Sequence, residues 1–176
     1  MGFDLSSIAS TLLSGDALDG IVSSTGASKK DISSVLTSAL PSLLSGAAKQ
    51  STGKDTALNF ASALEQHAAK PTNNLASFFK DVDALDGSKI IGHLLGGEKD
   101  TTAEKVAKQS GVDPKTVAKI LAVAAPLLMS LLGKKTNEAK KEDKTSTTAS
   151  LAQALLGGVT SNKFDVGDIL GSLLKK

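Results

Sequence analysis

The chain contains no cysteine, no arginine, no tryptophan and no tyrosine, and its phenyl rings are limited to five phenylalanines. Without cysteine, the chain has no disulfide framework, no thiolate metal site and no cysteine nucleophile. Nothing in this composition indicates an oxidising compartment. The missing residue types narrow the classes of function before any motif is considered.

All twenty basic residues are lysines, and the formal net charge is only +2. Proteins that read nucleic-acid sequence use arginine for bidentate contacts, and single-strand binders stack bases on aromatic rings. A nucleic-acid-binding protein of this composition would have no arginine for such contacts and no tryptophan or tyrosine for stacking.

We expect no secretory signal, and the sequence has no long apolar run. The first charged side chain is Asp4, with no cationic stretch before an apolar segment. The longest uncharged apolar run, residues 120–133, is shorter than the ~18–20 residues of a membrane span, which favours a buried helix. We expect a cytoplasmic chain that does not enter a membrane.

Helix signals dominate what is present, and they predict an all-α, multi-helical bundle. Three hydroxyl residues precede a carboxylate by three positions, which is the spacing of a capping box: Ser28–Asp31, Thr52–Asp55 and Thr101–Glu104. Asp113 before Pro114 indicates a fourth helix start. These signals predict helices that begin near residues 29, 53, 102 and 114.

The clearest pattern is an internal repeat, in which residues 26–45 recur as residues 111–130. Seven positions are identical: Gly26/Gly111, Lys30/Lys115, Leu36/Leu121, Ala39/Ala124, Pro41/Pro126, Leu43/Leu128 and Ser45/Ser130. Both copies carry a helical apolar stripe, and the second is apolar on its back as well. We expect residues 28–45 and 113–132 to form a pseudo-symmetric central pair, with each proline kinking or splitting its helix.

The segment Asp-Ala-Leu-Asp-Gly occurs twice, at residues 16–20 and 83–87. It is typical of a helix end and turn, with Asp86 or Ser88 capping the next helix. At the domain level, residues 1–133 are predicted to form one helical domain. Residues 134–150 form a polar linker or frayed helix end, and residues 151–176 form a short leucine-rich tail.

Two stretches, residues 103–121 and 21–36, follow the helix-turn-helix pattern of DNA-binding proteins. In the stretch 103–121, only Lys115 and Lys119 on the second helix are positioned to contact phosphate. That helix then becomes wholly apolar from Ile120 onward. The alternative is that the motif only joins two core helices at a sharp angle.

Catalytic and metal-binding patterns are not evident. His67 and His93 are the only imidazoles and have no zinc-binding spacing, while phosphate-loop and nucleophile-elbow patterns are missing. We expect no enzymatic activity, no cofactor, no metal and no small-molecule ligand. The best hint of a partner surface is a set of leucines that something must cover: Leu94, Leu95, Leu173 and Leu174.

The Gly-Val-Asp turn at residues 111–113, the apolar helix after it, and its Pro126-Leu127-Leu128 resemble the bacterial YidB-like family, also called domain of unknown function 937. The resemblance covers about residues 11–133. It implies a bacterial, cytosolic, all-helical fold with homeodomain-like features and no assigned activity, and it carries over no catalytic residue.

Together these features predict a non-enzymatic structural or protein-interaction module that self-associates through its leucine-rich tail. The alternative is a DNA-binding protein that uses its helix-turn-helix elements. The two hypotheses differ in whether Lys115 and Lys119 or the leucines make the functional contacts.

Overall fold

The computed structural model describes residues 5–142, in which every regular element is a helix and no strand occurs. The predicted all-α class is therefore confirmed for this part of the chain. The elements are α1 Leu5–Leu12, α2 Gly15–Thr25, α3 Lys29–Thr52, α4 Ala57–Ala68, α5 Leu75–Lys80, α6 Ala84–Leu95, the 3₁₀ turn η1 Gly96–Glu98, α7 Lys99–Ser110 and α8 Pro114–Glu142. The predicted tail, residues 151–176, lies outside the described residues.

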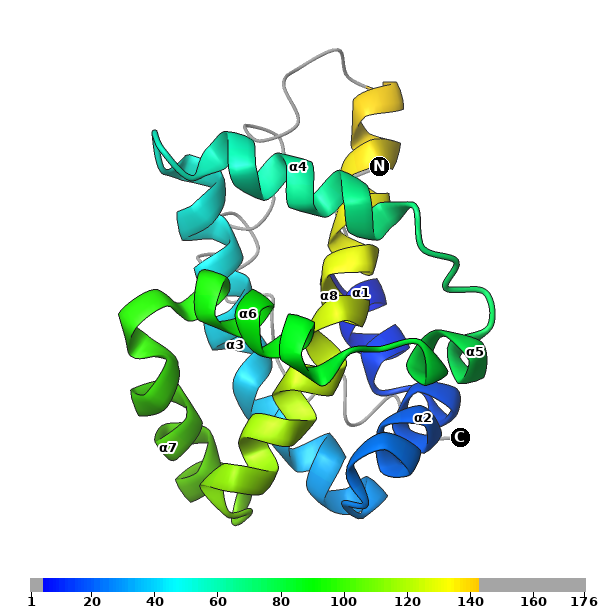
Figure 1. The fold of residues 1–176 in the computed structure, drawn as a ribbon, viewed down its shortest axis with the longest axis vertical. Coiled ribbons are helices and arrows are strands. Elements are labelled where there is room, and N and C mark those ends of the chain that lie inside the picture. Colours follow the sequence, from blue (N-terminus) through cyan, green and yellow to red (C-terminus); the bar gives the residue numbers. More distant parts are fainter. Residues whose placement is uncertain (1–4, 143–176) are drawn as a thin grey trace.

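Helix α8 is the centre of the fold, and the other helices pack around it (Figure 1). Helices α4 and α6 make the most extensive contacts with it, and α2 and α7 pack near its N-terminal half. Every residue from 120 to 130 is buried. The enclosed helix that the sequence predicted is therefore confirmed, and it explains why α8 is apolar on all sides.

Helix α8 is longer than its apolar run suggested. Its stretch Pro114–Asn137 is long and apolar enough to cross a membrane by length and composition, and 78% of that window is buried inside the protein. The helix continues through residues 134–142, the first half of the predicted linker. Ser130 and Thr136 are buried polar side chains of this helix, and their hydroxyls donate to the carbonyls of Pro126 and Leu132.

Two of the four predicted helix starts are confirmed, at Lys29 and Pro114. The start at 53 is wrong, because Thr52 ends α3 and donates its hydroxyl hydrogen to the Ala48 carbonyl, 3.1 Å away. The start at 102 is also wrong, since η1 leads directly into α7 at Lys99. Both repeated Asp-Ala-Leu-Asp-Gly segments lie in the first turns of helices, so the predicted helix end is wrong there as well.

Helices α3 and α8 continue without interruption through Pro41 and Pro126, so neither is split. Proline has no N–H group, and the carbonyl four residues earlier therefore loses its helical partner. In α8 that carbonyl belongs to Ala122. It faces Gly87 of α6, where a Cβ atom would overlap it. The carbonyl that lacks a helical hydrogen bond therefore lies where α6 and α8 cross most closely.

Glycine also allows close backbone contact at two further helix crossings. A Cβ atom at Gly46 of α3 would overlap the Leu94 carbonyl of α6, and one at Gly133 of α8 would overlap the Leu64 carbonyl of α4. A glycine without a side chain lets two helix backbones approach closely. These crossings fix the relative positions of α3, α4, α6 and α8.

The turns before α3 and α8 have the same geometry. Gly26 and Gly111 both adopt left-handed conformations, with φ of 75° and 74°. Their N–H groups donate to Val22 and Ala107. The following caps are Ser28 and Asp113, whose side chains accept from the N–H groups of Asp31 and Thr116.

The correspondence extends upstream of the glycines. The Thr25 hydroxyl donates to the Ile21 carbonyl and accepts from the Ala27 N–H. The Ser110 hydroxyl donates to the Val106 carbonyl and accepts from the Val112 N–H in the same way. Both turns are therefore built by equivalent hydrogen bonds that begin before residues 26 and 111.

Candidate functional site

A groove lies between α4 and α6, and α3 and α8 also contribute to it. We call it the α4–α6 groove. Its volume is about 340 Å³, which is at the lower end of the range for ligand and peptide pockets. Its apolar lining is Phe60, Ala63, Ile90, Leu94 and Met129, and its polar lining is Gln50, Thr56, Asn59 and His93.

The walls of the groove are held by the helix crossings described above. Gly133 brings α8 against α4, and Gly46 brings α3 against the end of α6 at Leu94. The turn from α3 to α4 is fixed by Thr56, whose hydroxyl donates to the Gln50 carbonyl at 2.9 Å. The groove therefore lies among elements whose backbones are in contact.

The chemistry of the groove is apolar and uncharged in its interior. No lysine, aspartate or glutamate is among the described residues that line it. Asn59 and His93 are exposed side chains that can donate and accept hydrogen bonds, whereas Phe60 and Met129 are buried. Such a groove suits the apolar face of a helix, whose side chains enter while its polar face stays in water.

A second cavity of about 330 Å³ lies between α3 and the α6–α7 region. It has mixed charge, because Lys49 and Glu98 line it together and their Nζ and Oε1 atoms are 3.9 Å apart. Both side chains are mostly exposed, and an exposed pair of this kind contributes little to stability. The α4–α6 groove is therefore the better candidate for a specific apolar ligand.

The structure separates the residues that the sequence predicted to be functional. Lys115 and Lys119 are exposed near the start of α8. Leu94 and Leu95 are 3% and 9% exposed and belong to the core, and Leu94 also lines the α4–α6 groove. The chain's own helices cover them, since the end of α6 packs against α3. Leu173 and Leu174 lie outside the described residues.

Sequence reasoning missed Phe60, Ala63 and Met129 as lining residues of one groove. They come from different helices, and no local motif joins them. Within the described residues, no three histidine, aspartate or glutamate side chains gather as a metal site would need.

His67 lies at the end of α4 and is 9% exposed. Among the described residues, none forms a hydrogen bond with its Nδ1 atom. Burial lowers the pKa of His67, the positive charge of Lys70 lowers it further, and the carboxylate of Asp86 opposes both. The neutral imidazole is therefore the form that the folded state favours.

We expect the fold to lose stability as the pH falls below about 6.5, because the unfolded state then binds a proton that folded His67 resists. Above about pH 6.5 the contribution of neutral His67 to stability is fully present. Urea unfolding between pH 5 and 8 measures the effect. His67→Leu should flatten the acid-side decrease, whereas His93→Gln, at an exposed position, should leave it in place. Equal curves for the two variants would contradict the assignment.

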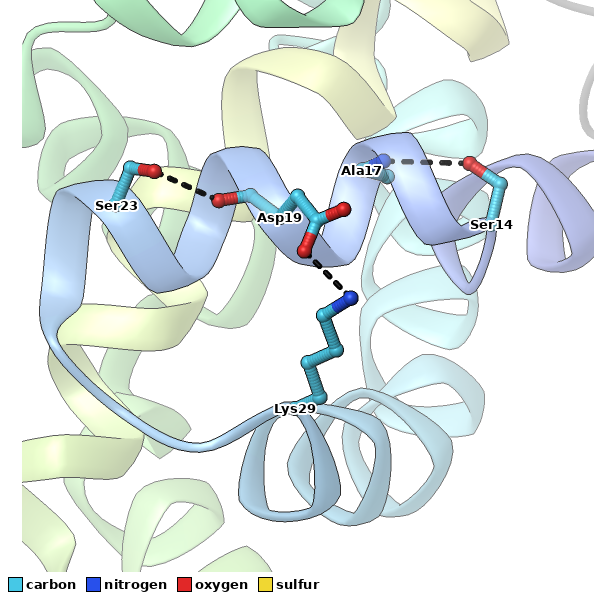
Figure 2. A network of polar contacts seen from close by, with 5 residues as sticks. All are labelled: Ser14, Ala17, Asp19, Ser23 and Lys29. Carbon is cyan, nitrogen blue, oxygen red and sulfur yellow. Dashed lines mark hydrogen bonds and ion pairs between the residues drawn. The ribbon is translucent and has the colours of Figure 1, made fainter.

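Figure 2 shows two polar contacts of α2 and its cap and one ion pair between α2 and α3. Ser14 caps α2 by accepting from the Ala17 N–H, and Ser23 donates to the Asp19 carbonyl. Lys29 at the start of α3 reaches back to Asp19, with Nζ and Oδ1 2.6 Å apart. Both charged side chains are more than half exposed, so the pair adds little stability.

Comparison with protein families gives one match. The matching family is described as a bacterial protein of unknown function (DUF937), and the match covers residues 8–135. This range extends from the start of the described helices almost to the end of α8. No curated protein and no solved structure matches the chain.

Proposed function

The chain belongs to the bacterial DUF937 family of unknown function, and we propose that it is a non-enzymatic protein-interaction module. In this proposal the α4–α6 groove binds the leucine-bearing face of a helix from a protein partner. The observation that carries the proposal is an apolar, uncharged groove whose walls are fixed by direct backbone crossings. Binding then needs little ordering of the groove itself, which favours affinity.

Self-association and a cytoplasmic location are part of the same proposal. A chain that self-associates should show an average mass above its monomer mass of 17.9 kDa in light scattering at high concentration. A monomer mass at every concentration would contradict self-association. The burial of α8 supports its role as a core helix and not as a membrane span.

Met129 offers a direct test of groove binding, because the chain has only two methionines and the other is Met1. With ¹³C-methyl-labelled methionine, the full chain gives one NMR signal from the groove and one from the N-terminus. An alanine-based helical peptide with leucines at i, i+3, i+4 and i+7 should shift the Met129 signal in a saturable manner. An all-alanine peptide of equal length should not.

Matched variants on α4 make this test specific. Ala63→Glu places a charge in the apolar groove and should weaken peptide binding at least tenfold, because the charge would be desolvated. Ser62→Glu adds the same charge at an exposed position beside it and should leave binding unchanged. An unshifted Met129 signal at about 1 mM peptide, in a groove that no segment of the chain itself occupies, would contradict the proposed function, since that concentration detects even weak binding.

DNA binding is the second candidate, and the arrangement of the two turns favours it. We propose that residues 21–45 and 106–130 are structural copies with a homeodomain-like helix-turn-helix geometry. The equivalent hydrogen bonds around Gly26 and Gly111 support this proposal, as does the packing of α2 on α8 and of α7 on α3. Both turns lie at the same end of the molecule, where Figure 1 shows α3 and α8 beginning.

On this alternative, replacing Lys115 and Lys119 by alanine should weaken binding to duplex DNA. Two lost phosphate contacts should reduce the slope of log K against log salt concentration by about 2. Lys54→Ala with Lys70→Ala is the matched control, because both lysines are exposed and lie near the two ends of α4. A mobility-shift titration at low salt measures binding, and no shift for the unmodified chain would end this alternative.

A further inference from the structure

Residues 166–174, beyond the described part of the chain, carry the side chains that the α4–α6 groove suits. Val166, Ile169, Leu170, Leu173 and Leu174 occupy positions i, i+3, i+4, i+7 and i+8. This is the anchor spacing of a helix that lays one face into an apolar groove. Asp168, the only charge between these limits, falls on the opposite face at 100° per residue and would stay in water.

The length of chain between the groove and this segment permits contact within one molecule. Helix α8 lines the groove at Met129 and ends at Glu142, about 20 Å further along its axis at 1.5 Å per residue. Residues 143–165 connect that end to the segment. A flexible linker with this number of residues would have a root-mean-square span of about 26 Å. This span is similar to the distance of about 20 Å between the end of α8 and the groove at Met129.

We propose that residues 166–174 occupy the α4–α6 groove of their own chain and compete there with a partner helix. This inference rests on the proposed function of the groove and names its resident occupant. A tethered segment whose span matches the distance acts at an effective concentration on the order of millimolar. At the lower concentrations of ordinary solutions, the chain's own segment therefore outcompetes the same segment of a second copy.

The absence of cysteine allows a clean crosslinking test in the full chain. Ala63→Cys in the groove, combined with Leu174→Cys at the edge of the apolar face, should form an intramolecular disulfide on mild oxidation. Ser62→Cys with Leu174→Cys is the control, because Ser62 is exposed beside the groove. We expect the first pair to form the intramolecular product at least tenfold faster, as read by non-reducing gel and peptide mass.

Two results of this experiment would overturn the inference. Equal rates for the two pairs would mean that the segment does not favour the groove. Disulfide-linked dimers as the main product of the Ala63→Cys pair would mean that a second copy supplies the occupant. Circular dichroism of each reduced variant verifies that the helices have formed.

A second measurement separates this inference from the proposed function. Leu170→Ser with Leu173→Ser removes two anchors from the segment while leaving every described residue unchanged. The Met129 signal should shift, and the leucine-bearing peptide should bind at least tenfold more tightly, because the fraction of open grooves increases. Equal affinity for the variant and the unmodified chain overturns the inference and leaves the proposed function standing. No peptide binding to the variant contradicts the proposed function itself and, with it, the inference.

Discussion

Gly87→Ala should lower the free energy of unfolding by about 3 kcal/mol, at the upper end of the usual cost of overpacking. A Cβ atom at Gly87 would overlap the carbonyl of Ala122, which belongs to the backbone of the central helix. Because a backbone atom cannot rotate away as a side chain can, α6 and α8 would have to separate. These two helices form one of the most extensive contacts in the described fold, so the separation would disturb much of the core.

The same helix contains the matched control. Gly92 also lies in α6, but a Cβ atom there would meet nothing within 4 Å. Gly92→Ala should therefore stabilise the protein by about 0.5–1 kcal/mol, since alanine loses less backbone entropy in a helix. Thermal unfolding followed by circular dichroism measures both, and the midpoint of Gly87→Ala should be about 6–12 °C lower. Similar midpoints for the two variants would contradict the close crossing.

The turns of this protein could be predicted from its sequence because their determinants are local. Gly26 and Gly111 need only a left-handed backbone, and Ser28 and Asp113 accept hydrogen bonds from residues three positions away. The repeat is visible in the sequence only from Gly26 and Gly111 onward, because Thr25 and Ser110 differ in identity. Their hydroxyls nevertheless make equivalent bonds, which only the structure reveals.

The helix crossings could not be predicted, because a glycine in a sequence can indicate either a turn or a close contact between two helices. Gly87 follows Asp-Ala-Leu-Asp, a composition typical of a turn, yet it lies inside α6. Its role depends on Ala122, which is distant in sequence and exposes its carbonyl because Pro126 lacks an N–H group. Pro126 and Gly87 each resemble a helix breaker, but Pro126 leaves the Ala122 carbonyl without a helical partner and Gly87 leaves room for that carbonyl.

The groove was missed for a related reason. Phe60 and Met129 look like ordinary core residues in their own helices, and both are buried. Their shared cavity arises from the way α4 and α6 cross α8. The sequence indicated only that something must cover Leu94. Gly46 allows α3 to cover the end of α6, and this contact between distant residues has no local signal.

Leu127→Ala should cost about 2–5 kcal/mol, because it removes a fully buried side chain and leaves a cavity. Leu127 lies on the back of α8, outside the stripe that the repeat shares with α3. Its burial distinguishes a helix enclosed on all sides from one with a solvated face. If the back of α8 faced solvent, the same substitution would change stability by no more than about 0.5 kcal/mol.

Leu58→Ala provides the comparison, because Leu58 is 81% exposed in α4 and loses little contact on truncation. Urea unfolding of both variants should show a large decrease in midpoint for Leu127→Ala and almost none for Leu58→Ala. The m-values should stay equal, since neither change alters how much surface unfolding exposes. Equal midpoints would mean that α8 is not enclosed by its neighbours. The walls of the α4–α6 groove would then lose the support on which peptide binding depends.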